Sequence, residues 1–117
     1  LTAFRLYLND ENAVDAVKGP IREVLAIHAE LSKIGSRRNS LYRQRNPLAQ
    51  DARRIRRNLD SLPLGRVAAK LRKQLVKQLA DNSAKAAEVA KGLVELEVER
   101  ATLQQKLAQL LKQLSLR

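Results

Sequence analysis

The residues best suited to chemistry are cations on both sides of a proline- and glycine-containing stretch. Between Arg37 and Lys77 there are 13 Lys/Arg and two acids, so 13 − 2 = +11, which equals the formal net charge of the 117-residue chain. Arginine binds phosphate in a bidentate manner, and such contacts release counterions from a polyanion. The candidate polyanion-binding residues are Arg53, Arg54, Arg56, Arg57, Arg66, Lys70, Arg72, Lys73 and Lys77.

These cations predict a negatively charged partner, and two kinds remain open. One is the phosphate backbone of RNA or duplex DNA, and the other is an acidic protein surface. The alternative without a partner is that the cations simply form a solvated face. The only aromatic residues are Phe4, Tyr7 and Tyr42, which argues against stacking on single strands. The chain also lacks the residue spacing of a recognition helix or a zinc finger, so we do not expect sequence-specific readout.

Residues for catalysis or metal binding are scarce. The single histidine, His28, has no cysteine in the chain to join it, and we expect it at the edge of an apolar stripe. Glu95, Glu97 and Glu99 alternate along a predicted helix and face different directions, which indicates a solvated surface. We therefore predict no enzyme, no catalytic, cofactor-binding or metal residues, and no small-molecule substrate.

Two helices must carry the cations, and the first shows strict 4-3 apolar spacing. Nine of its 11 seam positions are apolar, which predicts a coiled-coil seam. The exceptions, Arg38 and Arg45, either control register or, as we favour, cover the seam with their stems while their charges reach water. The seam positions are Ile27, Leu31, Ile34, Arg38, Leu41, Arg45, Leu48, Ala52, Ile55, Leu59 and Leu62.

Two proline-containing sites are expected to interrupt this first helix. Gly19-Pro20 leaves open whether the helix begins at Pro20 after a short preceding helix. Asn46-Pro47 predicts a kink or a short break, with Asn46 capping a restarted helix. The helix then ends in a turn at residues 61–65, because Leu62 precedes Pro63 and Gly65 has a permissive backbone.

The second helix has the clearer pattern, with ten apolar residues at 12 seam positions and Gly92 as its only glycine. A five-residue turn forces the two helices to lie antiparallel. We expect residue i to face roughly residue 128 − i, which pairs Ile34 with Val94, Ile27 with Ala101 and Arg45 with Ser83. The seam positions are Leu75, Leu79, Asn82, Ala86, Val89, Leu93, Leu96, Arg100, Leu103, Leu107, Leu110 and Leu114.

The predicted fold is thus all-α, a long antiparallel coiled-coil hairpin in one helical domain of residues 1–117. Residues 1–9 lead in, 10–61 and 66–116 form the arms, 61–65 form the turn, and Asn9–Asn12 offer cap side chains. Leu1–Leu8 reads equally as the strand-like tail of a preceding domain or as a short helical third element. Because Leu1 is no natural start, we expect a segment of a longer protein.

A second apolar line runs beside the seam of the second arm. It could receive Leu1–Leu8, a third helix or a second copy of the chain. The line comprises Val94, Val98, Ala101, Ala108 and Leu111.

Two sequence stretches form a pattern: Asn12–Lys18 leading into Ile21–Leu25, and Asp51 followed by Arg54-Ile55-Arg56-Arg57-Asn58-Leu59. They resemble the coiled-coil section of the uncharacterised bacterial mucoidy-inhibitor-like family. The family pattern is close to Arg-Ile-Arg-x-Asn-Leu before a turn and a second long helix. This chain departs from the pattern in two ways. The glutamine that usually stands just before the Arg-Ile-Arg run lies further upstream here, at Gln50, and the Asn46-Pro47 site is not expected in the family. The resemblance implies a helical spacer or assembly element without catalytic residues.

Function follows as a hypothesis with two main forms. The first is a non-catalytic structural or assembly arm that binds a protein partner or a second copy of itself, without cofactors. The alternative is a nucleic-acid-binding arm that uses the basic hairpin tip. A membrane partner is not expected, because it needs an exposed apolar face beside the basic one, and the hairpin uses the main apolar face.

Overall fold

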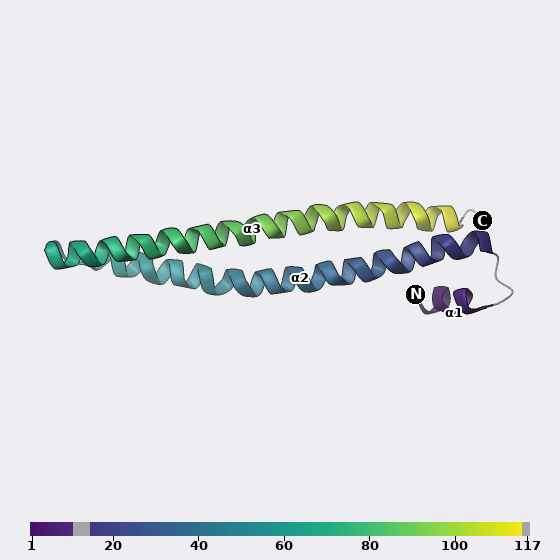
Figure 1. Ribbon diagram of the computed structural model, residues 1–117, viewed down its shortest axis with the longest axis horizontal. Helices are drawn as coiled ribbons and strands as arrows, with labels where there is room; N and C mark the ends of the chain where they lie inside the picture. The colour runs from purple at the N-terminus through teal and green to yellow at the C-terminus, as the bar shows by residue number, and fades with distance from the viewer. Residues whose placement is uncertain (11–14, 116–117) are drawn as a thin grey trace. The chain divides into compact units, whose positions relative to one another are not determined.

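The described part of the chain folds into three helices, and the periodicity predicts the two long ones. The structure is a computed structural model that describes residues 1–10 and 15–115, and side chains for 1–10 and 17–115. The helices are α1 (Thr2–Asn9), α2 (Asp15–Asp60) and α3 (Arg66–Ser115), and the described residues contain no strand (Figure 1). The all-α prediction is confirmed. Two compact units divide the chain: Leu1–Arg37 with Leu96–Arg117, and Arg38–Glu95.

The unit Arg38–Glu95 is a helical hairpin in which the end of α2 lies antiparallel to the start of α3. The backbone N–H of Ser61 donates to Arg57 O at 3.1 Å, and the N–H of Leu62 donates to Leu59 O at 3.3 Å. These bonds satisfy carbonyls that the last turn of α2 leaves without helical partners. Gly65 has φ +140°, and its carbonyl accepts the first bond of α3 from Ala69 N at 2.8 Å.

The seams lie where the 4-3 spacing places them. All 12 predicted positions of α3 are buried or half-buried, and so are ten of the 11 positions of α2 and the turn that follows it. The exception is Arg45, which is exposed. Ile34, at 1% exposure, and Ile55, at 3%, are among the best buried side chains. The coiled-coil pattern of the sequence therefore describes the buried face of each helix.

No break occurs at Asn46-Pro47, because α2 runs without interruption from Asp15 to Asp60; the kink, the other form of the expectation, stays a prediction. It also includes Gly19-Pro20, so the helix does not begin at Pro20. An interior proline removes one helical hydrogen bond and strains the preceding turn. Around Pro47 the seam residues Leu48 and Ala52 are half-buried, and their packing favours continuing the helix. Of the cap candidates Asn9–Asn12, Asn9 is the last residue of α1 and Asp10 is its C-cap, and residues 11–12 lie outside the described residues.

The predicted register of the hairpin is also wrong. Val94, expected opposite Ile34, is 64% exposed, and Ala101 and Ser83 are exposed as well. Instead, Gly92 lies against Leu41: a Cβ on Gly92 would be 3.1 Å from Leu41 Cδ1. The prediction assumed that α3 turns back level with the end of α2.

The start of α3 explains the shift in register. Arg72 Nη2 donates to the carbonyl of Pro63 at 3.4 Å, which places Arg72, rather than Arg66, near the level where α2 ends. The first residues of α3 therefore extend past the end of α2, whose faded end stops short of the start of α3 in Figure 1. We call residues 61–71 the tip.

The other unit combines α1 with the first part of α2 and the last part of α3. Val24, Ile27 and Leu110 form a buried cluster, against which Phe4 of α1 packs. Four partly buried leucines complete it: Leu31, Leu103, Leu107 and Leu114. The helical alternative for Leu1–Leu8 is therefore the one observed, and its Phe4 packs on a cluster of seam residues. The second apolar line is exposed at all five positions, so α1 does not cover it.

Candidate polyanion-binding site

The candidate cations come from two elements of the Arg38–Glu95 unit. Arg53, Arg54, Arg56 and Arg57 belong to the last turns of α2, and the other five belong to the first turns of α3. Eight of the nine are exposed, and Arg72 is half-buried. The hairpin thus places these two groups, which the turn separates in sequence, near the same end of the unit.

Few of these cations have acidic neighbours. Arg54 Nη2 lies 3.6 Å from Asp51 Oδ1, one turn earlier in the same helix, and Arg72 binds the Pro63 carbonyl. For the remaining seven, no carboxylate lies within 4.0 Å among the residues that the structure describes. Their charge is therefore balanced only by solvent ions, which a polyanion would displace.

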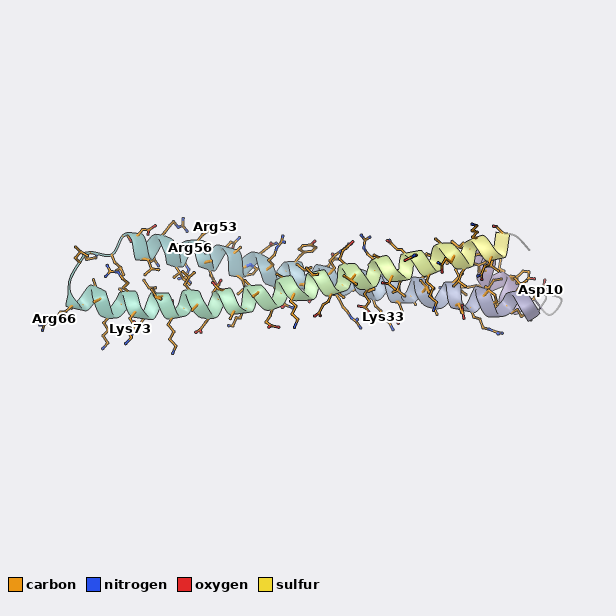
Figure 2. All side chains as sticks on the ribbon, turned by 90° about the horizontal axis from the view of Figure 1, so that it is seen from above. Asp10, Lys33, Arg53, Arg56, Arg66 and Lys73 are labelled. Carbon is orange, nitrogen blue, oxygen red and sulfur yellow. The ribbon has the colours of Figure 1, made fainter. Side chains whose placement is uncertain are left out.

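The cations do not form one continuous face. On α3, Arg66, Lys70, Lys73 and Lys77 repeat at steps of four and three, so they share one stripe. This stripe lies two residues before each seam position and points away from α2. Figure 2 shows Arg53 of α2 and Lys73 of α3 extending from opposite sides of the hairpin, with Arg66 at its end. A flat partner can therefore contact only one of the two faces at a time.

Apolar side chains at the tip were missed by the sequence analysis. Leu64 is 92% exposed, Val67 is 87% exposed and Leu71 is 44% exposed. With Leu62 and Pro63 they border a shallow hollow at the turn. The signal was available in the sequence, because none of the three falls on the 4-3 seam of either helix. Their exposure also depends on the extension of α3 past α2, however, and the sequence pattern did not predict that extension.

The two seam arginines behave differently. Arg38 is half-buried and Arg45 is exposed. The Arg45 guanidinium carbon lies 4.8 Å from the centre of the Tyr42 ring, one turn earlier, which is cation–π geometry. The Arg45 charge therefore leaves the seam along its own helix, as expected for a stem that covers apolar surface.

The remaining candidates have no binding geometry. His28 is half-buried, and the described residues contain no group of three His, Cys, Asp or Glu that could hold a metal ion. Glu95, Glu97 and Glu99 are exposed, as predicted. Glu97 Oε1 lies 2.7 Å from Arg100 Nη2, and this hydrogen bond raises the pKa of the Arg100 guanidinium.

Comparison with protein-family models, with curated proteins and with solved structures gives no match for this chain. The resemblance to the mucoidy-inhibitor-like family therefore stays a prediction. In the part of the chain that the structure describes, no helix is both long and apolar enough to cross a membrane. The site must be interpreted from its own geometry.

Proposed function

We propose that this chain is a non-catalytic assembly arm that binds a second copy of itself through the outward face of α3. The observation that carries the proposal is an apolar surface outside the seam, in the unit that contains the end of α3. Val98 is 62% exposed, Leu111 is 39% exposed, and Ala101 and Ala108 are exposed between them. Small and branched apolar residues on a helix surface suit close packing of another helix.

The seam itself supports a structural role. Each long helix gives its apolar face to the other, so the hairpin needs no partner for that face. An additional apolar line is then available for association. Val94, the member of this apolar line that belongs to the Arg38–Glu95 unit, is also on α3 and is 64% exposed. The proposed partner is a second copy, and a helix of another protein is the competing partner.

The test is the oligomeric state of the chain in solution. Analytical ultracentrifugation over a range of concentrations should show self-association, and Val98→Glu should weaken it by tenfold or more, because a charge would be buried in the contact. Val76→Glu is the matched control, since Val76 is 52% exposed on α3 but outside this line. A monomer at every concentration, with no partner recovered in pull-downs, would contradict the proposal.

A second candidate function is binding to the phosphate backbone of RNA or duplex DNA. It is supported by the seven exposed cations that have no carboxylate neighbour. A mobility shift at low salt is expected, with affinity falling steeply as salt rises. The α2 face is tested by a variant in which four arginines are replaced by Glu: Arg53, Arg54, Arg56 and Arg57. The α3 face is tested by a variant in which Lys70, Lys73 and Lys77 are replaced by Gln. The absence of any shift at low salt would remove this candidate.

A further inference from the structure

The tip presents apolar side chains and cations side by side. Leu64 and Val67 are almost fully exposed, and Arg66 lies between them in sequence at the end of the hairpin (Figure 2). Val67 and Leu71 are one turn apart, so they share a strip of α3 next to the basic stripe. This strip is an exposed apolar surface that lies outside the seam.

The charge at the tip and along the residues that follow it in α3 has one sign. From Ser61 to Ala80 the chain carries five Lys/Arg and no acid. Four of these cations lie on the α3 stripe, and all four are exposed. Lys70, Lys73 and Lys77 also border a shallow surface hollow that includes Val76, itself 52% exposed. Basic and apolar surface therefore alternate along the first three turns of α3.

We propose that the tip is a docking surface for an anionic lipid bilayer, with Leu64 and Val67 entering the interfacial layer. Cations of the α3 stripe would then lie at the level of the lipid headgroups. Amphipathic helices that lie in a membrane interface combine an apolar face with Lys/Arg on the polar face. Each Lys or Arg near an anionic surface strengthens binding by about fivefold.

Shape favours a lipid surface over the other polyanions. The tip protrudes past the end of α2, and the hollow that its apolar residues border is shallow, so these residues form a projection rather than a deep groove. A bilayer adapts to a projecting apolar wedge, whereas a protein partner needs a matching apolar cavity with an acidic rim. A nucleic acid would use the cations but not Leu64 or Val67, because a phosphate backbone offers no apolar surface and the tip has no aromatic residue for stacking.

The experiment uses the absence of tryptophan from the chain. Leu64→Trp places a single fluorophore at the tip, and Ala84→Trp places one at an exposed position on α3 away from the tip. Vesicles of phosphatidylcholine with about a quarter phosphatidylglycerol are compared with pure phosphatidylcholine vesicles. The proposal expects a blue shift of the Leu64→Trp emission with anionic vesicles only, and no shift for Ala84→Trp.

Cosedimentation of the otherwise unchanged chain then separates insertion from adsorption by charge. The double variant Leu64→Ser with Val67→Ser should bind anionic vesicles at least about tenfold more weakly, because the apolar contribution is lost while every charge remains. Both side chains are exposed, so circular dichroism should show unchanged helicity. Binding that survives both substitutions, no binding to anionic vesicles, or binding to duplex RNA alone would overturn the proposal. Because Val98 is not involved, failure here leaves the self-association test unaffected.

Discussion

Asn82 of α3 donates a hydrogen bond from Nδ2 to the carbonyl oxygen of Leu48 in α2, at 3.0 Å. Asn82 occupies a seam position and is 9% exposed, the only polar residue among the buried side chains of the described chain. A single buried asparagine in a coiled-coil seam fixes register at a cost in stability. This bond links two points far apart in sequence and sets how the two helices align.

Replacing Asn82 by leucine should raise stability and reduce uniqueness of pairing. Leucine adds apolar surface to the seam, and Leu48 O still has its helical partner, so no buried polar group is orphaned. We expect the free energy of unfolding to rise by about 1 kcal/mol, measured by urea titration followed at the helical circular-dichroism band. Ultracentrifugation of the variant should show additional species.

Asn82→Ala is the contrasting variant. It removes the hydrogen bond and leaves space in the seam, so unfolding should become easier by about 1–2 kcal/mol. A variant as stable as the wild type would mean that the bond to Leu48 contributes nothing to the hairpin.

Two helical glycines should respond differently to alanine. A Cβ at Gly35 would meet nothing within 4 Å, whereas at Gly92 it would lie 3.1 Å from Leu41 Cδ1. Gly35→Ala should therefore stabilise the chain by about 1 kcal/mol through helix propensity alone. Gly92→Ala should gain less, because the Leu41 methyl must move aside. Urea unfolding measures both.

A double-mutant cycle isolates this contact. In a Leu41→Ala background the obstruction is gone, so Gly92→Ala should recover the full propensity gain. Equal gains at Gly92 in both backgrounds would show that Leu41 does not pack against this position.

Gly65 should be the least replaceable glycine. Its φ of +140° lies in a region that residues with a Cβ rarely adopt, and its carbonyl accepts the first hydrogen bond of α3. Gly65→Ala should destabilise the fold by about 1–3 kcal/mol. Leu64→Ala, one residue earlier and 92% exposed, should change stability by less than about 0.5 kcal/mol. Thermal unfolding of the two variants compares the cost of backbone strain at residue 65 with the cost of removing an exposed side chain at residue 64.

The seams were predictable and the register was not, for a physical reason. Period alone determines which face of a helix is apolar, so Ile34, Ile55 and Val89 were placed correctly in the buried face. Register depends on where the chain re-enters the helix after Pro63, and a repeating seam accepts several alignments. The exposed tip leucine, Leu64, follows from the same local geometry, whereas the cations were identified from composition.

The register itself can be tested by cross-linking, because the chain contains no cysteine. The close approach of Gly92 to Leu41 predicts that Leu41→Cys with Gly92→Cys forms a disulfide under mild oxidation, because a Cβ at Gly92 would lie 3.1 Å from Leu41 Cδ1, so the two side chains point toward each other. The pair Arg45→Cys with Ser83→Cys represents the register expected from the sequence and should not cross-link efficiently. Non-reducing electrophoresis measures both.

The oxidised Leu41/Gly92 pair should also resist urea better than its reduced form, by up to about 4 kcal/mol in the free energy of unfolding, because the bond closes a long loop. Efficient cross-linking of the Arg45/Ser83 pair instead would show that the helices align symmetrically about the turn, and the protruding start of α3 would then be lost.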